Sequence, residues 1–155
     1  MSITRIALDD ALGQVLDATH DIIAAAATPG GRLSEVEETR VGVLGRRMIT
    51  SPGIAVTSPA ATAEHAQAMH EKWEIPVELW AFVSSEDQGG EVAAILLALR
   101  ARSVVLTDRR LGLGFVEDVQ SGDYEALGQH SSGRRVIARA RINVRLTIVE
   151  PDQEA

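Results

Sequence analysis

The sequence predicts an α+β fold, a single domain in which a mostly antiparallel sheet has helices packed on one face. Three observations lead to this prediction. Two segments carry apolar residues at helical spacing, two long segments alternate between apolar and polar residues, and the elements follow the order helix, short strands, long strand, helix, strand, loop, long strand. That order favours a sheet with helices on one side over alternating strand and helix units.

The chain of 155 residues has room for one domain with a proper core, which we assign to 1–150, and 151–155 ("PDQEA") reads as a flexible tail. Its 15 lysines and arginines against 22 aspartates and glutamates disfavour a general affinity for polyanions unless the positive charge is segregated. The lack of cysteine excludes disulfides, thiolate zinc sites and cysteine nucleophiles. Early aspartates argue against a signal peptide, and no apolar run has the length of a membrane span, so we expect a soluble product made in the cytoplasm.

The first half of the chain predicts one helix and several short strands. Apolar residues recur at helical spacing from Leu8 to Ala26, and "TPGG" at 28–31 ends the pattern. Short β-branched clusters around Val41, Ile49 and Ile54, separated by glycine and proline, predict short strands with turns. The segment 58–71 leaves two alternatives open, a short helix or a long loop.

The second half predicts a long strand, a helix, a strand, a polar loop and a final long strand. Odd positions from Trp73 to Val83 are apolar, which is typical of a half-buried strand. Ser85 and Gln88 have the spacing of a capping box, and the helix after them is expected to bury the face formed by Val92, Ile95, Leu96 and Leu99. A strand is expected through Leu111, Leu113 and Phe115, a polar loop over 118–133, and a last strand over 136–148.

No motif for catalysis, a metal or a cofactor is complete, so we expect neither an enzyme nor a bound cofactor. "HEKWE" at 70–74 has Glu74 where a zinc-protease helix needs its second histidine, and "LGLGFVE" has Glu117 where a dinucleotide-binding loop needs its third glycine. The histidines His20, His65, His70 and His130 lack partner ligands in the sequence.

The segment "RRVIARARINVRLTIV" at 134–149 holds the most concentrated positive charge. Its arginines, which we call the arginine stripe, are Arg134, Arg135, Arg139, Arg141 and Arg145. Three interpretations are open: the arginines pair across strands with carboxylates such as Glu74, Glu78 or Glu117, they meet the acidic surface of another subunit, or they bind nucleic acid. The third predicts aromatic stacking partners, and none lies in the stripe.

The order of elements carries a family resemblance. The run "EIPVELWAFVSS", then "EVAAILLALRARSVVL", then "LGLGFVEDVQSGDYEALGQHSSGRRVIARARINVRLTI" resembles the tail terminator (tail completion) family of long-tailed bacteriophages and related gene transfer agents. Those proteins have a strand, an amphipathic helix, a strand, a loop with acidic residues and glycines, and a last strand rich in arginine. The helix and short strands before this run also fit, and the segment 58–71 is longer than the family requires.

The resemblance implies a non-enzymatic virion protein of the tail and neck, assembled in the host cytoplasm. Such proteins form a homo-oligomeric ring, typically a hexamer, which ends polymerisation of the major tail tube protein and contacts the head–tail connector or stopper protein. DNA passes through the lumen only as cargo, and no membrane is involved. The arginine stripe then becomes a candidate subunit or tube interface. The candidate lumen or tube-facing loop carries Asp118, Asp123, Glu125 and His130.

Two other functions remain as alternatives. The first is another neck or minor tail component, such as a head-completion protein. The second is a small α+β enzyme or ligand-binding domain of the host cell, which a bound metal or nucleotide in the native protein would favour.

Overall fold

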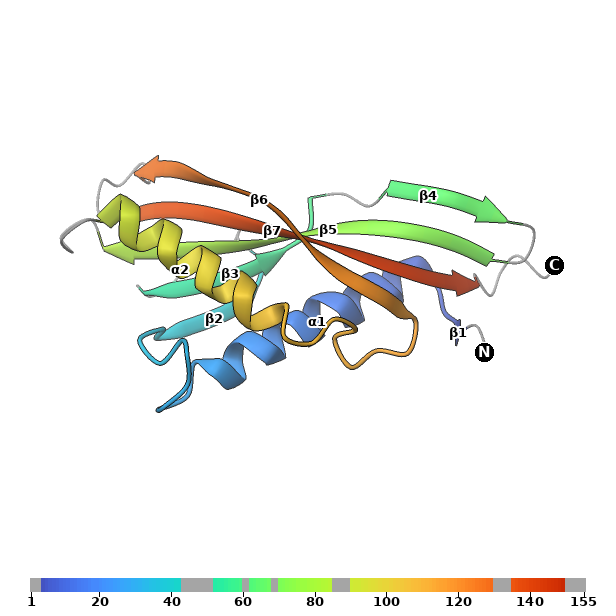
Figure 1. Ribbon diagram of the computed structural model, residues 1–155, viewed down its shortest axis with the longest axis horizontal. Coiled ribbons are helices and arrows are strands. Elements are labelled where there is room, and N and C mark those ends of the chain that lie inside the picture. Colours follow the sequence, from blue (N-terminus) through green and yellow to red (C-terminus); the bar gives the residue numbers. More distant parts are fainter. Residues whose placement is uncertain are drawn as a thin grey trace.

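The computed structural model describes residues 4–42, 52–59, 62–67, 70–84, 90–129 and 135–149. These ranges contain two helices and one sheet of seven strands. In chain order the elements are β1 (Thr4–Arg5), α1 (Leu8–Ala26), β2 (Glu38–Val41), β3 (Gly53–Thr57), β4 (Thr62–Gln67), β5 (His70–Ser84), α2 (Gly90–Val105), β6 (Val116–Gln129) and β7 (Arg135–Val149). The sheet is curled and mostly antiparallel, with both helices packed against it, which confirms the predicted α+β class (Figure 1).

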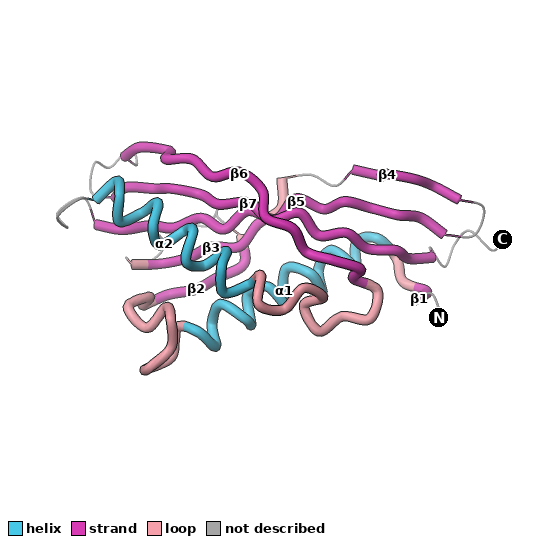
Figure 2. The backbone as a smooth tube through the Cα atoms, in the orientation of Figure 1, coloured by secondary structure: helices cyan, strands magenta, loops and turns pink. Residues whose placement is uncertain are grey.

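The two longest strands, β5 and β7, form the centre of the sheet. They pair antiparallel over their whole length, from Glu71 opposite Ile148 to Ser84 opposite Arg135. On their other sides, β7 pairs with β6 and β1, and β5 pairs with β3 and β4, while β2 adds to β3 (Figure 2). The alternation predicted for both strands is confirmed, because one set of side chains lies in the main core beneath the helices. That set is Ile75, Val77, Leu79, Ala81 and Val83 of β5 and Val136, Ala138, Ala140, Ile142, Val144, Leu146 and Ile148 of β7.

The first helix begins and ends where its pattern predicts. It buries a single stripe spaced by four residues: Ala11, Val15, Thr19 and Ile23. Asp9 and Asp10 lie in the first turn, where their charges favour the positive end of the helix dipole. After Ala27 the chain turns through Gly30, whose φ of 86° lies in the left-handed region that glycine tolerates.

The second helix buries a different face from the predicted one. Its core-facing residues are Ala94, Leu97, Ala98, Ala101, Val104 and Val105. Val92 and Leu96 are exposed, and Ile95 and Leu99 lie half-buried at its side. The helix is apolar on both faces, so spacing alone does not select the buried one, and the alanine-rich face is the one that packs on the sheet. The predicted capping residues Ser85 and Gln88 lie outside the described residues, as does Ile49 of the predicted short strands.

Three further predictions are wrong. The segment 58–71 was expected to be a short helix or a long loop, but its described residues include a strand, β4 at 62–67, which pairs with the start of β5. The strand predicted through Leu111, Leu113 and Phe115 is a turn, in which Leu111 and Gly112 have φ angles of 55° and 70°. Leu111 and Phe115 are nevertheless buried, which explains their apolar character.

The polar loop predicted over 118–133 is a strand as far as Gln129, and 130–134 lie outside the described residues. This strand, β6, pairs with β7 in a register that shifts at three places: between Val116 and Asp118, between Ser121 and Tyr124, and between Ala126 and Gly128. Each shift interrupts the alternation of side chains, so the sequence lacks the period of two that identifies a regular strand. The tail at 151–155 also lies outside the described residues.

Candidate functional site

Three arginines of the stripe lie on the face of the sheet opposite the helices. Arg139, Arg141 and Arg145 alternate along β7 with residues of the main core, so their side chains leave the sheet on the other side. Arg135 begins β7 opposite Ser84, and Arg134 lies outside the described residues. The three described arginine side chains therefore form part of the sheet surface that no described helix covers.

At the centre of this surface, one carboxylate accepts hydrogen bonds from two arginines. Glu78 of β5 is only 6% exposed and, with Thr19, is one of two buried polar or charged residues in the described chain. Its Oε2 accepts hydrogen bonds from Arg139 Nη1 and from Arg141 Nη2, the latter at 3.0 Å. Its Oε1 lies 3.3 Å from the Trp80 Nε1 donor. A buried carboxylate is tolerated when charged donors surround it in this way.

The predicted loop acids are the remaining partners of these arginines. Glu125 of β6 lies opposite Arg139 in register, and its Oε1 accepts from Arg139 Nε at 2.9 Å and lies 2.8 Å from Arg139 Nη2. Asp123 lies 3.7 Å from Arg141 Nε, too far for a hydrogen bond but close enough for an ion pair. We call Glu78, Asp123, Glu125, Arg139 and Arg141 the charge network. Arg139 and Arg141 of the candidate interface thus share one cluster within the subunit with Asp123 and Glu125 of the candidate loop.

The charges of the network act on the pKa of Arg139. Burial alone lowers that pKa, but the hydrogen bond to Glu125 and the charges of Glu78, Glu125 and Asp123 outweigh the burial. The pKa of Arg139 is consequently raised above its ordinary value, and this guanidinium stays protonated throughout the physiological range.

Arg145 and Glu74 form an ion pair further along the same face. Arg145 lies opposite Glu74 in register, with 4.0 Å between Arg145 Nη2 and Glu74 Oε2. Asp118 is the third described residue among the four candidate loop residues. It lies opposite Arg145 in register, and its Oδ2 accepts a hydrogen bond from Gln120 Nε2 at 3.3 Å. Glu117 was an expected partner of the stripe and accepts from Thr147 Oγ1 instead. His130 lies outside the described residues.

The other side of the charge network adjoins a small apolar cluster. Trp80 and Phe82 of β5 stack with 6.5 Å between ring centroids, and they pack with Ala55 and Ile137. Both rings are therefore engaged within the sheet, next to arginines that are themselves paired. A single-stranded nucleic-acid site needs exposed aromatic faces and unpaired cations. On this surface the two rings stack on each other, and Arg139 and Arg141 are paired with Glu78.

Two features of the surface were not anticipated from the sequence. Arg102, Arg109 and Arg110 each donate to a backbone carbonyl of β6, and Val92 and Leu96 of α2 project large apolar side chains into solvent. The exposed Val92 and Leu96 could have been identified from the sequence, because α2 has more apolar residues than one buried face needs.

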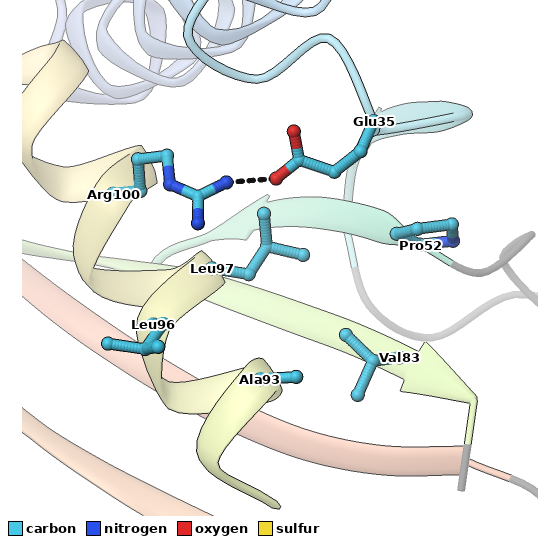
Figure 3. Close-up of a pocket in the computed structure, with 7 residues that line it drawn as sticks. All are labelled: Glu35, Pro52, Val83, Ala93, Leu96, Leu97 and Arg100. Carbon is cyan, nitrogen blue, oxygen red and sulfur yellow. Dashed lines mark hydrogen bonds and ion pairs between the residues drawn. The ribbon is translucent and has the colours of Figure 1, made fainter. Parts of the chain in front are cut away.

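A shallow pocket of about 360 Å³ opens between α2 and the chain around Glu35. Figure 3 shows Arg100 reaching from α2 toward Glu35, with which it forms an ion pair, and Leu97 beside them. The lining residues are Glu35, Pro52, Val83, Ala93, Leu96, Leu97 and Arg100. The volume is at the low end for small-molecule sites, and the one cation in the lining is already paired.

His20 is the one of the four histidines whose side chain the structure describes. His20 Nε2 lies 3.0 Å from Thr39 Oγ1 and links α1 to β2. Within the described ranges, no three histidine, aspartate or glutamate residues gather closely enough to hold a metal ion. Neither described helix is both long and apolar enough to cross a membrane. No known family model matches the chain, and no curated protein matches it at a significant level.

Proposed function

We propose that this chain is a tail terminator, a structural virion protein that forms a hexameric ring at the head-proximal end of a phage tail tube. It ends polymerisation of the major tail tube protein and joins the tail to the head–tail connector or stopper protein. DNA crosses the lumen as cargo, and the protein acts by assembly and not by catalysis. The basis of the proposal is the order of β5, α2, β6 and the arginine-rich β7, preceded by α1 and the short strands β2 and β3.

One structural observation supports assembly over nucleic-acid binding. The arginines at the centre of the stripe are paired within the subunit, by Glu78, Glu125 and Asp123. Meanwhile large apolar side chains stay exposed on α2 and β6. Guanidinium groups that are already paired displace few counterions from nucleic-acid phosphates, whereas exposed apolar surface is typical of protein–protein contacts.

The pairing also revises the role of the arginine stripe. In the described structure its central members hold β5, β6 and β7 together on the face away from the helices. We therefore assign Arg139 and Arg141 to the stability of the subunit, and we place the assembly contacts elsewhere on its surface.

Electron microscopy of purified protein mixed with tubes of the matching major tail tube protein tests the proposal. A ring with a central hole, capping one end of each tube, is the expected result. Tubes whose ends stay bare at saturating protein would contradict it. Binding to the isolated head connector, with no binding to tubes, would instead identify the chain as another neck component.

A further inference from the structure

The first half of β6 has carbonyl oxygens occupied by arginines from outside the sheet. Arg110 Nε donates to Val116 O at 3.1 Å, Arg109 Nη1 to Val119 O at 2.7 Å, and Arg102 Nη1 to Gly122 O at 2.5 Å. Carbonyls with such partners are poor acceptors for an incoming strand, and charged side chains along an edge are a known protection against pairing with other chains. The stretch 116–122 is therefore protected.

The second half of β6 lacks this protection. Within the described ranges, β6 pairs with β7 alone, and no described side chain donates to a carbonyl of 123–128. Large apolar side chains are exposed here, Tyr124 at 54% and Leu127 at 37%. The charged residues of this half, Asp123 and Glu125, form ion pairs with Arg141 and Arg139 of β7. An edge whose carbonyls are occupied along one half only is suited to accept a strand at the other half.

This open half adjoins the exposed side of α2. Tyr124 pairs in register with Ala140, which belongs to the main core, so Tyr124 leaves the sheet on the helix side. Helix α2 contacts β6 on that side. The solvent side of α2 carries Val92, 60% exposed, and Leu96, 52% exposed, which also lines the pocket beside Glu35. We call the open half of β6 and the exposed side of α2 the α2–β6 face. A helix that is apolar on both faces is normally covered on both, and in the described structure the side of α2 away from the sheet leaves Val92 and Leu96 more than half exposed.

The opposite edge of the sheet provides a matching strand. β2 pairs with β3 alone among the described strands, and its last residue, Val41, is 44% exposed. Its four residues are short enough to fit within 123–128. Figure 1 shows β2, α2 and the end of β6 at one end of the elongated sheet, with β4 at the other end.

We infer that the α2–β6 face receives the β2 edge of a second copy of this chain. The inference rests on the proposed ring, because a ring repeats one head-to-tail contact between two different surfaces of the same molecule. The two edges of one sheet are such surfaces, and joining them extends the sheet from copy to copy. An isologous contact of β6 with β6 would instead close a dimer and leave β2 uncovered.

The absence of native cysteine permits a direct test by cross-linking. Two variants, Leu127→Cys and Val41→Cys, each place one thiol at one of the two edges. They are treated with a short bis-maleimide reagent, separately and mixed, in concentrated solution and on tail tubes. A cross-linked dimer that forms in the mixture and is absent from each variant alone is the expected result. Asp21→Cys, at an exposed site on α1, replaces either partner as the matched control and should give no dimer.

Two results would overturn the inference. One is a dimer of equal yield in a single variant alone, which would indicate an isologous contact. The other is a mixture without dimer both in solution and on tubes. Adding Leu96→Glu to the Leu127→Cys variant should also abolish the dimer, because it places a charge in the α2–β6 face. Protein that caps tubes without this cross-link would support the proposed function and refute the inference. A cross-link without capping of tubes would support the contact between copies and contradict the proposed function.

Discussion

Arg141 lies directly opposite Glu78 in the register of β5 and β7, and its Nη2 donates to Glu78 Oε2 at 3.0 Å. The same oxygen also accepts from Arg139, two residues earlier on β7. Two positive groups therefore converge on one buried carboxylate, and β6 supplies the additional negative charges of Glu125 and Asp123. The pairing joins three strands on the face that carries no described helix, so these arginines contribute to folding.

Replacing Glu78 with glutamine should destabilise the subunit. The change keeps the shape of the side chain but leaves two guanidinium groups without their shared negative charge. We expect the free energy of unfolding to fall by about 1–3 kcal/mol. The fall is smaller than for a fully buried pair, because both arginines reach solvent and Arg139 keeps its ion pair with Glu125. Urea denaturation measures this loss. Asp21→Asn, at a side chain that is 81% exposed, is the control and should change stability by less than about 0.5 kcal/mol. Equal stabilities for the two variants would show that the charge network contributes nothing.

Charge reversal at Arg141 should affect folding and assembly before DNA affinity. Arg141→Glu places a third carboxylate beside Glu78 and Asp123, so it should lower the free energy of unfolding and weaken ring formation. In the milder Arg141→Gln variant, the affinity for duplex DNA should fall with salt concentration as steeply as in the wild type, so the slope of log affinity against log salt concentration should not change. A slope lower by about one in a folded Arg141→Gln protein would identify Arg141 as a phosphate contact.

The raised pKa of Arg139 predicts a stability contribution that is flat across the neutral and mildly alkaline range. A group whose pKa is higher in the folded state stabilises the fold fully below its unfolded pKa, and the contribution is lost only as the pH rises through the folded pKa. For an arginine both values lie above the usable range. The difference in free energy of unfolding between wild type and Arg139→Gln should thus stay constant from about pH 7 to about pH 10. A decline over this interval would contradict the raised pKa.

Two glycine-to-alanine variants should shift stability in opposite directions. Gly13 lies in the middle of α1, where an added Cβ meets nothing within 4 Å, so Gly13→Ala should stabilise by about 0.5–1 kcal/mol through helix propensity. At Gly31 the added Cβ would stand 2.2 Å from the carbonyl oxygen of Ala26, so the backbone must shift and Gly31→Ala should destabilise by about 1–3 kcal/mol. Thermal unfolding compares the two variants, and a loss of stability in Gly13→Ala would contradict the packing around α1.

The sequence predicts the elements that have a clear period. The alternation from Trp73 to Val83 and from Val136 to Ile148 identifies β5 and β7, and the stripe from Leu8 to Ala26 identifies α1. Periodicity fails where the chain has two apolar faces, as in α2, or where bulges break the alternation, as in β6. It also fails for the apolar residues of the turn at 111–115, which are buried without forming a strand.

The candidate site was only partly predictable for a related reason. Pairing of the arginines with Glu74 and Glu78 follows from two alternating strands that lie side by side. The partnership with Asp123 and Glu125 depends on β6 being a strand next to β7, which the glycine and serine content of 118–133 conceals. The carbonyl contacts of Arg102, Arg109 and Arg110 depend on a turn that places them beside that strand.

The length of tail tubes polymerised in the presence of this protein is the decisive test of its proposed role in assembly. Wild-type protein and the Asp21→Asn control should arrest growth and give short tubes with capped ends. Leu96→Glu, which disrupts the α2–β6 face without touching the core, should leave growth unlimited. Tubes that grow to the same length with and without wild-type protein would contradict the claim that this chain is an assembly protein of the tail.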